Sequence, residues 1–191
     1  MKKLIVLSLM LLMHASCQAE LKLPNIFGNH MVVQQKAPIK VWGLTVPGQK
    51  VTAELGGQSA STTADAEGKF VLAIPELTAG GPHTLTITAD ETKTFQDVLV
   101  GEVWICSGQS NMQWSVNAAN DADLERLAAK HPNLRMINFP QVGVQEPIWT
   151  HDDRQWQVCT PETVGGFSAV GYFFGRQLLD TLDVPVGMIN N

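Results

Sequence analysis

Apolar and polar residues alternate in short runs over residues 20–100, and turn residues separate the runs. Leu85 and Ile87, for example, fall on one face of an extended segment, and the threonines between and beside them fall on the other. Glycine and proline pairs such as Pro47-Gly48 interrupt the runs at close intervals. Short strands separated in this way are typical of an antiparallel β-sandwich. The pattern predicts strands at residues 31–34, 39–42, 50–55, 59–63, 70–74, 83–88 and 92–98.

The pattern changes after residue 100, where apolar strands alternate with helical segments. Asp121 and Ser168 are the predicted N-caps of two helices, and Leu124 and Leu127 belong to the predicted apolar face of the first. Strand–helix–strand alternation predicts a parallel sheet in an α/β layer. The strands are expected at residues 102–107, 134–139 and 186–190, and the helices at residues 121–130 and 168–182.

The first 19 residues have the pattern of a signal peptide rather than of a folded segment. Lys2 and Lys3 precede an apolar run from residue 4 to residue 13 that is too short to span a bilayer. Small residues follow, and cleavage is expected after Ala19. The alternatives are a buried N-terminal element, or a lipoprotein anchored at Cys17, although His14 stands where the lipoprotein pattern has an aliphatic residue. We therefore expect an exported protein, periplasmic or extracellular, with no membrane contact unless Cys17 is lipidated.

Composition and charge narrow the function classes. The chain has 191 residues, 45% of them hydrophobic and 16% charged, which is typical of a globular protein. A formal net charge of −5 argues against a nucleic-acid partner, which would favour a basic patch. The sequence has no histidine or cysteine cluster at metal-ligand spacing and no phosphate-binding loop, so we expect no metal and no cofactor. Cys106 and Cys159 remain after cleavage, either as a disulfide or as two buried thiols.

A turn after the strand at residues 102–107 places a serine where hydrolases hold their nucleophile. Gly108, Gln109, Ser110 and Asn111 follow the strand and precede a helical segment. Backbone N–H groups of such a turn can stabilise a developing oxyanion. The residues alone leave the alternative of an ordinary polar turn, because Gly, Ser and Asn all favour turns.

The string from Val100 to Met112, VGEVWICSGQSNM, resembles the serine block of the sialate O-acetylesterase family, a branch of the SGNH (GDSL-like) hydrolases. Other segments are similar to this family in the same order: residues 23–34, 38–43, 47–51, 156–163 and 165–179. The resemblance therefore covers nearly all of the chain from residue 23 onward. It implies a flavodoxin-like parallel sheet in an SGNH-like domain that follows the β-sandwich.

The resemblance also implies a reaction. Ser110 would be the catalytic nucleophile, Gly108, Gln109 and Asn111 would be oxyanion or substrate-binding residues, and the substrate would be an acetylated sugar or sialoglycan. The family's Asp and His lie in later blocks that this sequence does not contain, so we expect an incomplete esterase domain. The adjacent His151 and Asp152 are interpreted as a solvated loop rather than as the missing base.

The expected organisation is thus a two-part α+β chain. It consists of a signal peptide (residues 1–19), a β-sandwich domain (residues 20–100) and the first part of an SGNH-like esterase domain (residues 101–191). The alternative is a non-catalytic, secreted carbohydrate-binding β-sandwich module with a remnant of a hydrolase.

Overall fold

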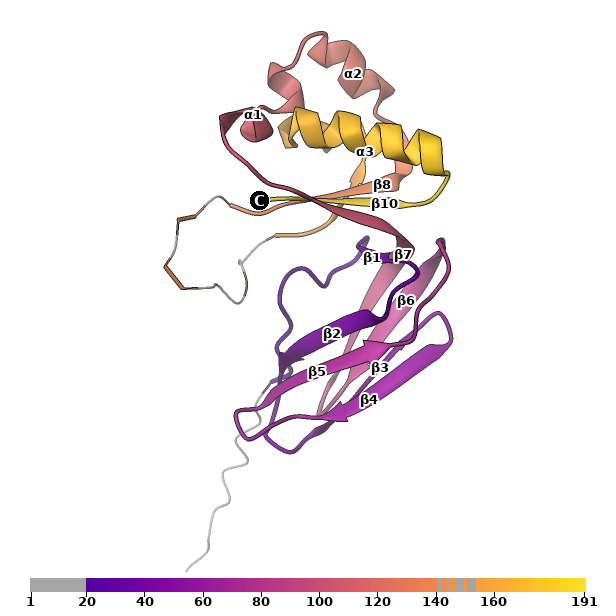
Figure 1. Ribbon diagram of the computed structural model, residues 1–191, viewed down its shortest axis with the longest axis vertical. Helices are drawn as coiled ribbons and strands as arrows, with labels where there is room; N and C mark the ends of the chain where they lie inside the picture. The colour runs from indigo at the N-terminus through magenta and orange to yellow at the C-terminus, as the bar shows by residue number, and fades with distance from the viewer. Residues whose placement is uncertain (1–19, 141, 144, 147–149, 151–153) are drawn as a thin grey trace, which may run out of the picture.

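The computed structural model describes residues 20–140, 142–143, 145–146, 150 and 154–191. The predicted signal peptide with Cys17, and the His151-Asp152 pair, lie outside the described residues. The chain folds around one large mixed sheet, with helices on one side of its parallel strands (Figure 1).

The predicted strands of the first part form close to the expected positions. Alternating burial along β5 places Phe70, Leu72 and Ile74 in the core, as the sequence pattern indicates. The strands are β1 (Val32–Gln34), β2 (Ile39–Leu44), β3 (Lys50–Leu55), β4 (Gln58–Thr63), β5 (Lys69–Ile74), β6 (Gly80–Thr88) and β7 (Thr92–Cys106).

The second part contains three further strands and the helices that were expected between them. The short α1 (Ser110–Gln113) and η1 (Val116–Ala118) follow β7 directly. The remaining elements are α2 (Ala122–Ala128), β8 (His131–Asn138), β9 (Gln157–Cys159), η2 (Val164–Gly166), α3 (Ala169–Leu182) and β10 (Val186–Asn190).

A single eight-stranded sheet joins the two parts. Its order is β4-β3-β6-β7-β10-β8-β9, with β1 paired to β7 beside this path, while β2 and β5 form a separate two-stranded sheet. The β7, β10 and β8 strands are mutually parallel, and the β3, β4, β6 and β9 pairings are antiparallel. The structure is therefore a mixed α/β fold with a mostly antiparallel sheet and a parallel segment.

Strand β7 runs through the predicted boundary between residues 100 and 101. Its first part pairs with β6, residues 99–101 pair with β1, and residues 102–106 pair with β10. The two strands expected at 92–98 and 102–107 are one element, so a separate β-sandwich followed by a separate α/β layer is not confirmed. Gly101 permits this continuity, because a Cβ there would overlap the carbonyl oxygen of Pro185.

Strands β8 and β10 are largely buried on both faces, as parallel strands generally are, whereas β7 exposes Trp104 and Ile105. Met136 and Met188 point into one core under α3, whereas the next residues, Ile137 and Ile189, pack against the core of the first part. The β-rich first part is thus the layer that covers one face of the parallel strands, and the helices cover the other (Figure 1).

Two predictions about the second part are wrong. A flavodoxin-like order would place its first strand, β7, between the next two, but the third strand, β10, lies in the centre instead. Asp121 adopts a left-handed conformation and its side chain does not cap α2. The predicted apolar face of α2 is exposed, at 66% for both Leu124 and Leu127, because the described part of the chain places no element over it.

A charged cluster fixes the first part to β8. The Arg135 guanidinium, only 5% exposed, donates to both carboxylate oxygens of Asp97 at 2.7 and 3.2 Å, and it also donates to the carbonyl oxygen of His30. The His30 ring hydrogen-bonds the same carboxylate through Nδ1 at 2.7 Å. These hydrogen bonds, chiefly that from Arg135, hold the pKa of the Asp97 carboxyl below its usual value.

Replacing Asp97 with Asn should lower the free energy of unfolding at pH 7 by roughly 1–3 kcal/mol, because Arg135 loses its charged partner. Asn tolerates the left-handed backbone that Asp97 adopts (φ 56°), so the backbone is preserved. Because the folded pKa is lowered, the stabilisation is complete above the ordinary carboxyl pKa. It disappears as the pH falls through the folded value. Urea denaturation between pH 7 and pH 3 measures both effects.

The control is Asp180→Asn, which removes an exposed carboxylate from α3. It should leave the stability and its pH dependence close to those of the wild type. Equal stability of Asp97→Asn and wild type at pH 7 would show that the cluster does not hold the two parts together.

Candidate active site

The predicted nucleophile lies in an exposed turn at the carboxyl end of the parallel strands. β7 ends at Cys106, whose carbonyl oxygen accepts a hydrogen bond from the Asn191 N–H at 2.9 Å. The turn leads directly into α1, and Ser110 is the first helical residue. The predicted site residues Gly108, Gln109, Ser110 and Asn111 are all exposed to solvent.

The position of Ser110 gives the turn an orientation that suits an oxyanion. In helix geometry the first N–H groups, here those of Ser110 and Asn111, have no acceptor within the helix. They are therefore available to a ligand above the turn. Among the described residues no side-chain hydrogen bond engages the Ser110 hydroxyl, so it is open to an incoming group.

Backbone contacts with the start of α3 hold the serine segment in place. Ser115 forms a β-bridge with Ser168, the Val116 N–H donates to the Phe167 carbonyl at 3.0 Å, and the Ala169 N–H donates to the Trp114 carbonyl at 2.7 Å. These bonds flank the short helix on its C-terminal side. Tertiary contacts, rather than helix propensity, thus set the geometry of the turn.

Ser168 serves both elements. Its hydroxyl is buried, accepts the Gly171 N–H at 3.2 Å as the N-cap of α3, and donates to the Met112 sulfur at 3.4 Å. The prediction that Ser168 caps this helix is confirmed. The same side chain connects α3 to α1, so it links the helix cap to the serine segment.

Two asparagines lie at the same sheet edge, and the sequence interpretation did not identify them. Asn190 and Asn138 end neighbouring strands and are in register with Cys106 across the sheet. Asn190 Nδ2 donates to Asn138 Oδ1 at 2.9 Å, and Asn138 Nδ2 donates to the Gly166 carbonyl at 3.4 Å. Both were visible in the sequence as polar residues at the ends of apolar strands.

Next to these amides, a hollow of about 280 Å³ is lined by Asn138, Arg154, Gln155 and Gln157. Gln157 begins β9 and faces β8 at Met136, so the preceding residues extend along the final residues of β8. Figure 1 shows α1, the last residues of β8 and β10, and the chain that leads into β9 on the same side of the molecule.

The described histidines do not supply a base to Ser110. His30 hydrogen-bonds Asp97, and His83 pairs with Val98, both in the middle part of β7. Cys106 is nine positions after Asp97, which is at most roughly 30 Å at the rise of a strand. His131 lies at the opposite end of β8 from Asn138. The arrangement provides an exposed serine hydroxyl and N–H donors, but among the described residues no histidine for proton transfer.

The two cysteines are free thiols, which decides between the two readings of the sequence. Cys106 and Cys159 lie on β7 and β9, with β10 and β8 between them. Three strand spacings are about 14 Å, well beyond the reach of a disulfide. Burial raises the pKa of Cys106, and it raises that of Cys159 to about 12, so both thiols are protonated and unreactive near neutral pH.

The described residues contain no cluster of His, Cys, Asp or Glu side chains suited to a metal ion. Within the same part of the chain, no helix is both long and apolar enough to cross a membrane.

Comparison with known proteins assigns the chain to a class. No protein-family model matches the sequence. The crystal structure of a novel carbohydrate acetylesterase from Xanthomonas citri superimposes with a TM-score of 0.86 at 34% identity, covering 90% of this chain and 40% of that one. The chain thus shares the fold of a carbohydrate esterase.

The curated relatives give the family. The sialate O-acetylesterase of Homo sapiens is 32% identical over 206 residues, and that of Mus musculus is 30% identical over 183 residues. The chain belongs to the sialate O-acetylesterase family, as its serine block indicates. The matches cover 97% and 85% of this chain but 39% and 34% of the human and mouse proteins.

Replacing Ser168 with Ala should lower the free energy of unfolding by about 1 kcal/mol, because α3 loses its N-cap. The substitution also removes the contact with Met112, so backbone amides of residues 109–114 should exchange with solvent faster. Denaturant titration and hydrogen-exchange mass spectrometry measure the two effects.

Ser61→Ala, an exposed serine on β4, is the matched control and should change neither quantity. Unchanged exchange over residues 109–114 in Ser168→Ala would mean that the serine segment does not depend on this side chain.

Proposed function

We propose that the chain forms part of an exported carbohydrate O-acetylesterase in which Ser110 is the nucleophile. The observation that carries this proposal is the exposed Ser110 at the start of a short helix, directly after strand β7. Family membership supports the same reaction class. The substrates would be O-acetylated sugars, sialic acids among them.

In this reaction the Ser110 Oγ attacks the carbonyl carbon of the acetyl ester, and a base takes the hydroxyl proton. The N–H groups of Ser110 and Asn111 stabilise the oxyanion of the tetrahedral intermediate, and Gly108 and Gln109 shape the approach to it. The bond to the sugar oxygen then breaks, that oxygen takes a proton, and an acetyl-serine remains. Water hydrolyses the acetyl-serine to acetate and restores the serine.

The base is proposed to come from sequence beyond residue 191. Two facts support this proposal: the described histidines lie far from Ser110, and the relatives are much longer than the matched region. We also propose that the organisation follows the sequence expectation, with an esterase domain that begins near residue 101.

Replacing Ser110 with Ala should lower acetyl-ester hydrolysis by about a thousandfold or more, since no other group forms the acyl intermediate. The measurement is release of acetate from an O-acetylated sialic acid by the polypeptide that includes the sequence encoded after residue 191. Ser107→Ala is the matched control, because Ser107 is equally exposed in the same turn, and its rate should stay within about twofold of the wild type.

Hydrolysis by Ser110→Ala at the wild-type rate would contradict the esterase proposal. It would favour the alternative of a non-catalytic carbohydrate-binding module.

Export gives a separate prediction. Residues 1–19 should be removed in the cell, so that the mature N-terminus is Glu20, because the apolar run and the small residues match a signal peptidase substrate. Mass spectrometry of the protein from the cell envelope and medium measures this. A mature N-terminus at a lipid-modified Cys17 would show anchoring instead, and an intact Met1 in the cytosol would contradict export.

A further inference from the structure

We propose that the hollow lined by Asn138, Arg154, Gln155 and Gln157 binds the carboxylate of an acidic sugar, with Arg154 as the residue that sets this preference. The inference rests on the proposed function, because it assigns a substrate feature to the same site. It names the carboxylate-recognising group, which neither the resemblance nor the comparisons assign.

The position of the hollow relative to Ser110 supports this proposal. Cys106, Asn190 and Asn138 are in register on three adjacent strands, so the hollow begins about 10 Å from the strand end that leads to Ser110. Both features therefore lie at one sheet edge. A sialic acid carries its carboxylate and its terminal hydroxyls at opposite ends, so one sugar can place an acetyl ester at the serine and its carboxylate at the hollow.

The chemistry of the lining supports it as well. Arg154 offers a planar guanidinium that matches a carboxylate with two parallel hydrogen bonds. Gln155 and Gln157 are exposed and add amide donors, and the lining residues that the structure describes include no carboxylate. Within the described residues no acidic side chain forms an ion pair with Arg154.

Contacts of Trp156 and Asn138 position the backbone around the hollow. Trp156, two residues after Arg154, is buried, and its indole N–H donates to the Ile26 carbonyl at 2.8 Å. Asn138 is fixed by its hydrogen bonds to Asn190 and Gly166. The Asn138 wall is therefore fixed by hydrogen bonds, and the backbone that follows Arg154 is anchored through Trp156.

The test is a titration of the mature polypeptide used in the hydrolysis experiment with N-acetylneuraminate and with its methyl ester, followed by NMR or calorimetry. The free acid should bind at least about tenfold more tightly than the ester, which has lost the negative charge. In Arg154→Gln this preference should fall to about twofold or less. Arg126→Gln, which removes an exposed arginine from α2, should keep the full preference.

Each other outcome overturns the proposal. Equal binding of acid and ester by the protein that retains Arg154, no binding of either, or an unchanged preference in Arg154→Gln would each exclude Arg154 as the carboxylate-binding residue. All proteins in this titration also carry Ser110→Ala, so the methyl ester is not hydrolysed and binding is measured without turnover. Failure here is thus distinct from failure of the Ser110 hydrolysis experiment, which would contradict the esterase function itself.

Discussion

Strand β7 forms backbone hydrogen bonds with strands of both parts of the chain, and the rest of the structure depends on its running unbroken from one part into the other. It pairs with β6 and β1 in its first part and with β10 toward its end. At the crossing point Gly101 leaves room for the Pro185 carbonyl oxygen, which accepts the Glu102 N–H at 2.9 Å. A side chain at this position would overlap the Pro185 carbonyl oxygen, so β7 or the connection into β10 would have to move.

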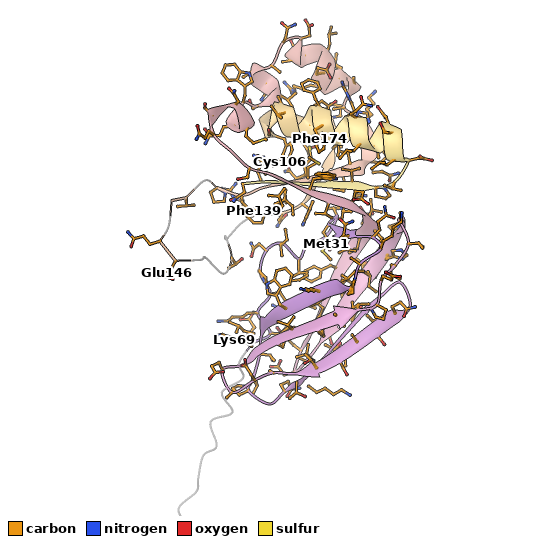
Figure 2. All side chains as sticks on the ribbon, in the orientation of Figure 1. Met31, Lys69, Cys106, Phe139, Glu146 and Phe174 are labelled. Atoms are coloured by element: carbon orange, nitrogen blue, oxygen red, sulfur yellow. The ribbon has the colours of Figure 1, made fainter. Side chains whose placement is uncertain are left out.

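The same strand explains why the β-rich part and the helical part are interdependent. Parallel strands require cover on both faces, and α3 covers only one of them. Ile137 and Ile189 project into the core formed by β2, β3 and β5, and the Arg135–Asp97 ion pair fixes this contact with charge. Figure 2 shows Cys106 between the helices and the strand layer, where β7 ends and the serine turn begins. The first part is therefore a structural layer of the site-bearing sheet.

Local patterns predicted the elements well, and non-local pairings account for the failures. The two-residue alternation in β5 and β6 reports burial directly, so those strands were found. Gly101-Glu102 reads as a break between strands because the sequence does not show that Pro185 packs there. The central place of β10 depends on its pairing with β7, which is more than eighty residues earlier in the sequence. The exposure of Leu124 and Leu127 depends on the absence of a covering element among the described residues. Periodicity identifies an apolar face but not what covers it.

The residues of the candidate site also differ in whether local sequence or non-local pairing brings them into place. The exposed position of Ser110 at a helix start was predictable because a strand, a glycine turn and a helix start are contiguous in sequence. Asn138, Arg154 and Asn190 come together only through the sheet order, and polar residues at strand ends were the only available signal.

The four-residue α1 could not form alone, since the conformational free energy needed to nucleate a helix exceeds the stabilisation from the hydrogen bonds of one turn. The hydrogen bonds to Phe167 and Ala169 and the cap residue Ser168 therefore determine where the serine stands. Because α3 in turn packs on Met188 and Leu134, the reach of Ser110 toward a ligand is fixed by the same core that holds β10 and β8 together.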